Sequence, residues 1–486
     1  VEAMNAAVLE ATSTDDWKTM VNNYCFQNPF VLNVEDTIAN LTEQRNHMLL
    51  CDPVSSVIPK MAVPTIISML ITNIYNMADT FFVSQLGTSA SGAVGVIFSA
   101  MAIIQAVSFM IGMGAGTHVS QALGAGNREK ADAYASTSFF TAFIAGVILA
   151  FFSLTNIDAV VRFLGSTETI APYAKDYATY IFYAMPFMMC SFVMNNLLRF
   201  EGLTMYGMVG ITAGGILNIV LDPILIFALD MGTAGAALAT GIGQCIGGVV
   251  PAVYILRQKD LPLRFAPFKF EASPILHACA NGSSEFMSNI STSFVSALYN
   301  MQLMRMLGED GVSAYGVLMY VQLIFIGTAI GYSIGCAPIV SYHYGAGHHD
   351  ELKNMLKKSL TLMGITGVAL TMLALGLAAP LAKIFVGYDE GLLDLTRHAF
   401  SIFSFSFLLS GLNIFASGFF TALNNGLISA VISFARTLVF QAACVLLLPA
   451  MFGVDGIWYA TLVAEGLACL LSLWLIDRKK YFYHYL

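Results

Sequence analysis

The sequence has little charge. Only 11% of its 486 residues are Asp, Glu, Lys or Arg, whereas 57% are hydrophobic. Soluble domains carry about a quarter charged residues, so a chain this apolar cannot cover its surface with polar groups, and most of that surface must face lipid. Apolar stretches of about 20 residues recur along the whole chain, and the strict alternation of a membrane β-barrel is absent. The composition predicts a polytopic helical membrane protein.

Motifs of metal, redox and nucleotide sites are also missing. The eight cysteines form no C-x-x-C pair, and no H-E-x-x-H sequence occurs, so we interpret the cysteines as small packing residues rather than disulfides or metal ligands. The glycine-rich stretch at 112–116 lies inside an apolar span with no strand before it, which favours close helix packing over nucleotide binding. We expect no cofactor, no metal apart from a coupling Na⁺, and no nucleic-acid partner.

The apolar runs predict twelve membrane spans. They cover residues 58–86, 92–122, 131–155, 170–199, 206–229, 233–257, 279–306, 313–343, 354–378, 393–421, 427–451 and 455–476. Most Lys and Arg residues fall in one set of connecting loops, and the opposite set carries only Arg162, Lys175, Arg305, Lys383 and Arg397. Because basic loops stay on the cytoplasmic side, we expect a multi-pass protein of the cell membrane with both termini in the cytoplasm.

The chain repeats itself with a shift of 221 residues. ALGAGNREKAD at 122–132 aligns with HYGAGHHDELK at 343–353, and GTAGAALAT at 232–240 aligns with GVDGIWYAT at 453–461. Six spans separate the two copies, so the halves have parallel topology, an arrangement typical of transporters that rock around a site near the membrane midplane. The predicted fold is all-α, with twelve transmembrane helices in two six-helix lobes related by pseudo-two-fold symmetry.

This repeat divides the chain into five segments. An acidic N-terminal extension (1–52) precedes the first lobe (53–257), a cytoplasmic linker (258–278), the second lobe (279–477) and a basic cytoplasmic tail (478–486).

Two carboxylates in the first lobe have matching depths. Asp79 lies about seven residues before the outer end of its span, as does Asp222, and Thr240 lies about seven residues after its span begins. Asn218 is one turn from Asp222 on the same helix face. Two neighbouring carboxylates in apolar surroundings do not both ionise cheaply, so we expect this set to accept a proton or to hold Na⁺. A hydrogen-bonded network that only fixes helix packing is the alternative.

The remaining charges in the spans suggest two further roles. Arg436 and Glu465 have matching depths on adjacent antiparallel spans, which predicts a structural ion pair. Glu285 belongs to a polar stripe with Asn289, and Asn76 belongs to a similar stripe in the first span. We expect these stripes to line a central cavity, where Glu285 either binds substrate or pairs with Arg436.

The fourth span adds candidate walls for such a cavity. It is rich in Met, Phe and Tyr, and Met185 and Met189 are its candidate cavity residues. Thioether and aromatic groups beside a carboxylate suit large, variable, apolar cations. Packing or contact with lipid is the alternative for these side chains.

Several stretches, taken in order, carry a family resemblance. They are PTIISMLITNIYNMADTFFVSQLG (64–87), VSQALGAGNREKAD (119–132), LRFEG (198–202), LNIVLDPILI (217–226), GTAGAALAT (232–240), GSSEFMSNISTS (282–293), SYHYGAG (341–347) and GVDGIWYAT (453–461). From about residue 52 onward the chain resembles the multidrug and toxic compound extrusion (MATE) family.

The resemblance implies two six-helix lobes in a V shape and antiport of organic cations against H⁺ or Na⁺. It maps the family's first-lobe coupling site onto Asp79, Asn218, Asp222 and Thr240. Some branches of the family carry an acid in the tenth span, and the interior of the tenth span of this chain has none. That departure favours coupling through the first lobe.

Other functions stay open at this stage. The same scaffold also suits export of an endogenous metabolite or a lipid-linked precursor, although a pyrophosphate-linked lipid calls for several basic cavity residues and only Arg436 qualifies. Intramembrane aspartyl hydrolysis by Asp79 and Asp222 is a distant alternative, and we expect no enzyme activity. The expected partners are small organic cations and membrane lipids, and we expect a monomer.

Overall fold

The computed structural model describes residues 48–49, 52–257, 272–387, 389–483 and 485, and its regular elements are helical. Most of the predicted extension and residues 258–271 of the predicted linker therefore lie outside the described residues. The first lobe holds α4 (Val54–Ser84), α5 (Thr88–Gly124), α6 (Arg128–Thr155), α7 (Ile157–Phe163), α8 (Ala171–Phe200), α9 (Thr204–Pro223) and α10 (Gly232–Arg257). The second lobe holds α11 (Ala272–Ala346), α12 (His349–Val386), α13 (Glu390–Phe403), α14 (Phe407–Ala422), α15 (Gly426–Phe434), α16 (Gln441–Phe452) and α17 (Val454–Tyr483).

Each predicted span corresponds to a helical segment of this structure. Ten segments within the described residues are long and apolar enough to cross a membrane. One of them, α11, holds two predicted spans, because its backbone leaves the helical region at Gly308 with a φ of 66°. The span predicted at 427–451 is α15, a π-helical turn at Ala435–Phe440, and α16. The short helix α7 was not predicted.

The backbone repeats as the sequence does. Positive φ angles occur at Gly87 and Gly308, at Gly126 and Gly347, and at Gly232 and Gly453, and the members of each pair are 221 residues apart. Glycine adopts this conformation without the steric cost that a Cβ brings. The aligned glycines therefore place the same turns at the same points of both lobes.

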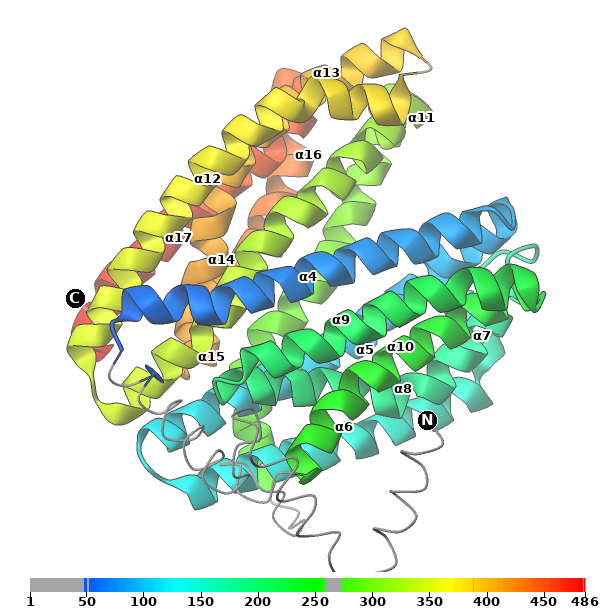
Figure 1. Cartoon of the computed structure of the whole chain (residues 1–486). Coiled ribbons are helices and arrows are strands. Elements are labelled where there is room, and N and C mark those ends of the chain that lie inside the picture. The colour runs from blue at the N-terminus through cyan, green and yellow to red at the C-terminus, as the bar shows by residue number, and fades with distance from the viewer. Residues whose placement is uncertain (1–47, 50–51, 258–271, 388, 484, 486) are drawn as a thin grey trace, which may run out of the picture.

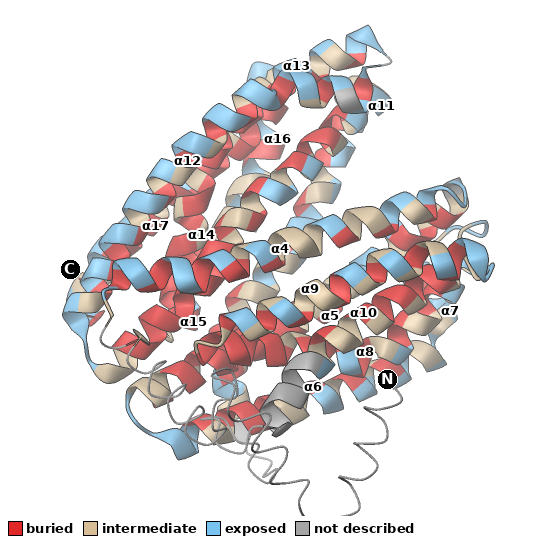
Figure 2. Cartoon of the chain, viewed as in Figure 1, coloured by how far each residue is buried: buried red, intermediate tan, exposed pale blue. Residues whose placement is uncertain are grey.

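The outer faces of the helices are apolar. Figure 2 shows buried residues between the helices and exposed residues on the outer faces of both bundles. Large exposed side chains include Phe151, Ile365, Leu447 and Met451, which are 71%, 61%, 64% and 72% exposed. Such a surface is stable in a hydrocarbon solvent and not in water, so the chain is a multi-pass membrane protein.

The two bundles meet at one end and diverge toward the other (Figure 1). They meet where α5 and α11 end and where α6 and α12 begin, and we name this the basic end because Arg128, Lys130 and Lys353 lie there. The opposite end, which includes the turn at Gly308, is the open end.

Reciprocal glycine contacts hold the basic end together. A Cβ at Gly124 would collide with the backbone oxygen of Tyr342, and a Cβ at Gly345 would collide with the backbone oxygen of Gln121. Gln121 and Tyr342 are themselves related by the repeat, so the two contacts are copies of each other. The Ser120 hydroxyl also donates across this interface to the oxygen of Pro338 at 3.1 Å.

Helix α4 contacts both lobes. A Cβ at Gly335 would lie 2.7 Å from the Cα of Ala62, so α4 packs closely on the second half of α11. Further along α4, the Asn73 amide donates to the oxygen of Leu323 on α11 at 2.9 Å. On its other side a Cβ at Gly215 of α9 would lie 3.0 Å from the Tyr75 ring. Any movement of α4 in the first lobe therefore reaches the second lobe.

Candidate functional site

Three helices of the first lobe bring the four predicted polar residues together. Asp79 is on α4, Asn218 and Asp222 are on α9, and Thr240 is on α10. All four are at least nine-tenths buried, and Asp222 is completely buried. The Asn218 amide donates to Thr240 Oγ1 at 3.3 Å and lies 3.5 Å from Asp222 Oδ1. The matching depths along the helices thus correspond to one cluster in space.

The cluster has a fifth member, Tyr177, which was not predicted from the sequence. It lies on α8, is 1% exposed, and donates its hydroxyl to Asp79 Oδ2 at 3.3 Å. The sequence did indicate this position, because Tyr177 stands about seven residues, or two turns, after the start of its predicted span and so has nearly the same depth as Asp79. Tyr177 belongs to the fourth span, whose Met, Phe and Tyr side chains were interpreted as cavity walls or packing rather than as partners of Asp79.

Three oxygens of the cluster have no hydrogen-bond partner among the residues that the structure describes. They are Asp79 Oδ1, Asp222 Oδ2 and Asn218 Oδ1, and each is shielded from solvent. A buried polar atom without a partner costs about 1–3 kcal/mol, and more when it is charged. The three oxygens therefore favour the binding of a positively charged species. A proton on a carboxylate or a hard cation with oxygen ligands meets that requirement.

The backbone beside Asp222 is irregular. Helix α9 ends at Pro223 and continues as a π-helical turn at Ile224–Ala228. Proline removes one backbone donor from the helix, and single π-turns of this kind are frequent at functional sites. The irregular turn also allows α10 to approach closely, because a Cβ at Gly235 would lie 2.7 Å from the Leu225 oxygen.

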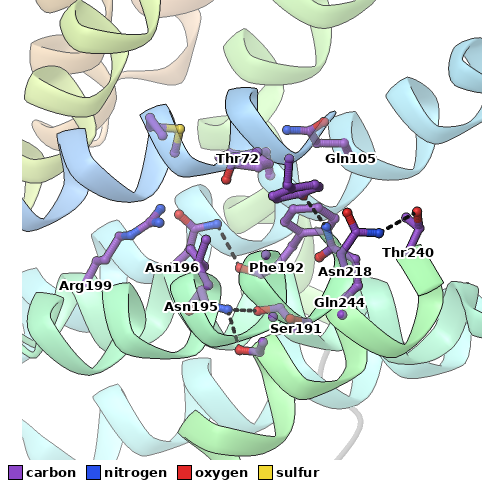
Figure 3. Close-up of a pocket in the computed structure, with 18 residues that line it drawn as sticks. Thr72, Gln105, Ser191, Phe192, Asn195, Asn196, Arg199, Asn218, Thr240 and Gln244 are labelled. Carbon is purple, nitrogen blue, oxygen red and sulfur yellow. Dashed lines mark hydrogen bonds between the residues drawn. The ribbon is translucent and has the colours of Figure 1, made fainter. Parts of the chain in front are cut away.

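A pocket extends from this cluster through the interior of the first lobe (Figure 3). It is lined by Met69, Thr72, Tyr75, Gln105, Phe109, Ser191, Phe192, Asn195, Asn196, Arg199, Ile211, Gly214, Gly215, Asn218, Thr240, Gly243, Gln244 and Gly247. We name it the first-lobe pocket. Asn218 and Thr240 belong to both the pocket and the cluster, so a ligand in the pocket lies next to the two carboxylates.

The residues predicted to line a central cavity have mixed positions. Asn76, Glu285 and Asn289 are half-buried. Within the described part of the chain, the Glu285 carboxylate has no hydrogen bond or ion pair, although the Asn289 amide donates to the Glu285 backbone oxygen at 2.8 Å. A half-buried carboxylate without a partner is available to a cationic ligand.

Met185 and Met189 lie elsewhere. They are 2% and 0% exposed and belong to the packed core of the first lobe, where a Cβ at Gly146 of α6 would lie 3.3 Å from the Met189 sulfur. Neither lines the first-lobe pocket. Their thioethers fill space between helices, as flexible apolar side chains often do, and we do not carry them into the proposed binding surface.

In the second lobe Arg436 contacts Glu465. The Arg436 Nη2 atom lies 2.8 Å from Glu465 Oε1, and Arg436 Nε donates to both carboxylate oxygens at 2.9 and 3.0 Å. The Asn413 amide donates to Glu465 Oε2 at 2.6 Å. The structure therefore brings the two predicted partners together and pairs Arg436 with Glu465, leaving Glu285 apart.

In the repeat, the residues of this ion pair align with residues that line the first-lobe pocket. Glu465 aligns with Gln244, Arg436 aligns with Gly215, and both Gln244 and Gly215 line the pocket. Thr461, the counterpart of Thr240, receives a 2.7 Å contact from the Tyr299 hydroxyl. In the second lobe the ion pair thus occupies the positions that border open space in the first.

Comparisons with known proteins agree with this architecture. The family model MatE matches residues 64–224 and again residues 286–446, so the duplication is recognised independently. The chain is 24% identical over 437 residues to the multidrug export protein MepA of Staphylococcus aureus (strain MSSA476), covering 87% of this chain and 94% of MepA. It is 23% identical over 421 residues to MepA of Staphylococcus saprophyticus, covering 85% of this chain and 92% of that protein.

A solved structure shares the fold. It shows the outward-facing conformation of a multidrug resistance MATE family transporter of the MOP superfamily, with a TM-score of 0.84 at 24% identity, covering 88% of this chain and 97% of that one. The predicted twelve-helix, two-lobe fold is thereby confirmed, and so is the expectation of a transporter rather than an enzyme. The family model covers about two thirds of the chain, and the chain belongs to the MATE family of multidrug and toxic compound extrusion transporters.

Proposed function

We propose that the chain exports organic, mostly cationic amphipathic drugs by antiport against H⁺ or Na⁺. The observation that carries the proposal is the buried cluster of Asp79, Asn218 and Asp222, whose three unpartnered oxygens favour a bound cation. The Glu285 carboxylate, half-buried and without a partner in the described part of the chain, supports a preference for cationic substrates. The likeness to the multidrug export protein MepA supports drugs as the cargo.

We assign the basic end to the cytoplasm, because Lys and Arg accumulate there. Both termini are then cytoplasmic, and the bundles diverge toward the outside of the cell (Figure 1). In this orientation the cluster lies nearer the outer surface, where cations that enter from outside reach it first. The expected state is one that releases drug outward and takes up the coupling cation.

Coupling follows from the position of α4. Cation binding neutralises Asp79 near one end of α4, while Ala62 and Asn73 hold the earlier part of the same helix against α11 of the second lobe. A shift of α4 on cation binding therefore changes the contact between the lobes. The cation drives the transition only by binding one state more tightly than the other, and the local change at Asp79 supplies that difference.

The test uses purified protein in proteoliposomes loaded with ethidium. We impose ΔpH and ΔNa⁺ separately and compare the wild type with Asp222→Asn. Gradient-driven ethidium transport should occur with one of the two gradients and should be lost in Asp222→Asn. The matched control is Asp230→Asn, which removes an exposed acid of the same lobe. Asparagine, like aspartate, tolerates the positive φ of 52° at this position. Undiminished gradient-driven transport by Asp222→Asn would refute the proposed role.

A further inference from the structure

One turn of the second lobe forms polar contacts with the first lobe at the basic end. This turn, residues 421–425, joins α14 to α15, and we name it the interlobe turn. The Gln121 amide of α5 donates to the Ala422 backbone oxygen at 3.1 Å. One turn earlier on α5, His118 Nδ1 lies 3.2 Å from the amide nitrogen of Asn424. Both contacts join the two lobes, so the interlobe turn contributes to the closed state of the basic end.

The backbone of the interlobe turn has an uncommon conformation. Asn424 has a φ of 63°, and the only other non-glycine residue with a positive φ in the described part of the chain is Asp230. In the corresponding turn of the first lobe, between α8 and α9, a positive φ of 87° belongs to Gly202. Glycine adopts this conformation at no steric cost, and asparagine is among the few other residues that tolerate it. The asparagine adds a side chain that glycine lacks, and this side chain contacts His118.

The end of α17 holds the interlobe turn through Asn425. The Asn425 amide nitrogen donates to the Tyr483 hydroxyl at 2.6 Å, and Asn425 Oδ1 accepts from the backbone nitrogen of Ile428 at 3.1 Å. Asn425 thus caps α15 with its oxygen and binds α17 with its nitrogen. With both ends of the amide bound, the position of this residue in the interlobe turn is fixed.

Aromatic packing keeps Tyr483 in place. Its side chain is 5% exposed, and its ring centroid lies 5.8 Å from that of Tyr344 on α11 and 6.1 Å from that of Tyr485. Tyr485 is completely buried, with its ring 5.2 Å from the Phe419 ring of α14. Its hydroxyl donates to the Ile476 backbone oxygen at 3.0 Å. The residues that follow α17 therefore pack back onto the second lobe, beside the interlobe turn.

We propose that Tyr483, supported by Tyr485, is a conformational latch that stabilises the closed basic end through the interlobe turn. The contacts with His118 and Gln121 require one conformation of this turn, and ordering a free turn costs conformational entropy. Because Tyr483 already fixes the turn through Asn425, closure of the lobes meets a preorganised partner. Weakening the latch therefore raises the population in which the basic end is open. This inference goes beyond the proposed function, because it concerns the balance between two conformations and not the cargo or the coupling ion.

Chemical modification of a buried cysteine measures that population. Ser120 is completely buried, and its hydroxyl donates across the lobes, so Ser120→Cys reacts with a maleimide only when the basic end opens. The reporter chain carries Ser120→Cys with the eight native cysteines replaced by alanine, and ethidium transport shows that it folds. In nanodiscs the reaction rate follows the open population when opening is fast compared with modification.

The first test substitution is Tyr483→Phe, which keeps the ring and removes the hydroxyl that accepts from Asn425. It should raise the reaction rate of the reporter by roughly two- to tenfold, the range that one neutral hydrogen bond contributes. An unchanged rate would overturn the proposal.

A second substitution tests whether the latch acts through the interlobe turn. Asn424→Gly removes the side chain that contacts His118 and suits the positive φ, so it should also raise the rate. Residues that act through one element are not additive. Tyr483→Phe and Asn424→Gly together should therefore raise the rate by less than the product of their separate effects. A combined effect equal to that product would show that Tyr483 acts independently of the turn and would overturn the proposal.

The matched control is Tyr481→Phe, the same change at a tyrosine of α17 that is 77% exposed. It should leave the rate unchanged, and a rise equal to that of Tyr483→Phe would also contradict the latch. All variants are compared at one pH, without drug and without an ion gradient. A failure of this inference is therefore distinct from a failure of cation-coupled transport.

Discussion

The ion pair in the second lobe allows the sharpest stability prediction. Glu465 is 2% exposed and receives polar contacts from Arg436 and Asn413 between 2.6 and 3.0 Å. The change Arg436→Met keeps much of the side-chain volume and removes the positive charge. The Glu465 carboxylate then stays buried with only an amide as partner. Breaking a buried pair in this way costs about 3–5 kcal/mol, because one charge is left uncompensated.

A second variant separates the cost of the orphaned charge from the value of the pair itself. Arg436→Met combined with Glu465→Leu removes both charges, and replacement of a buried pair by apolar residues of similar size is often neutral. We therefore expect the double variant to regain most of the lost stability, and to retain ethidium transport if the pair is structural as predicted.

The assay is reversible unfolding by SDS in mixed micelles, with the free energy of unfolding compared among the variants. Asp477→Asn serves as the control, because Asp477 pairs with Lys480 at 2.6 Å in an exposed position, and exposed pairs contribute little. A single variant as stable as the wild type, or a double variant as unstable as the single one, would refute the reasoning.

Three further predictions concern transport. Tyr177→Phe removes the donor to Asp79 Oδ2; because that hydrogen bond favours the ionised carboxylate, its loss should strengthen binding of a coupling proton by about tenfold, read as a shift of transport toward higher pH, while equilibrium dye binding stays constant; no shift would remove Tyr177 from the site. Glu285→Gln should weaken rhodamine 123 binding severalfold, and equal affinity would argue against Glu285 as the substrate's counter-charge. Gly345→Ala should separate the lobes at the basic end, because its Cβ collides with the Gln121 backbone. The distance between spin labels at positions 130 and 354, measured by electron paramagnetic resonance, should then increase. In the control Gly364→Ala, where the added Cβ meets open space, the distance should not change.

Much of the cluster could be predicted because depth is a linear property of a helix. A rise of 1.5 Å per residue places Asp79, Asp222 and Thr240 at one level before any packing is known. The same reasoning matched Arg436 with Glu465. The repeated glycines, such as Gly126 and Gly347, were visible as aligned letters and adopt the same φ of 73°.

The direction in which a side chain points around its helix was not predictable in the same way. Met185 and Met189 have a suitable depth for a cavity wall, yet they face the packed core of the first lobe. Arg199 was counted only as a basic residue near a loop, although it is buried in a pocket. These orientations depend on which helices pack on α8, and the sequence of one span does not show which helices those are.

The glycine contacts at the basic end have a consequence for how easily the lobes part. Because Gly124 and Gly345 are copies of one position, the two contacts that they make are related by the repeat, and a rotation of the lobes about their shared axis separates both together. The hydrogen bonds donated there by Ser120 and Gln121 come from neutral side chains, and water replaces such bonds at little net cost. Backbone atoms of the two lobes approach closely at this interface, but the polar contacts there contribute little net stability. The contact between the lobes at the basic end is thereby suited to repeated opening and closing.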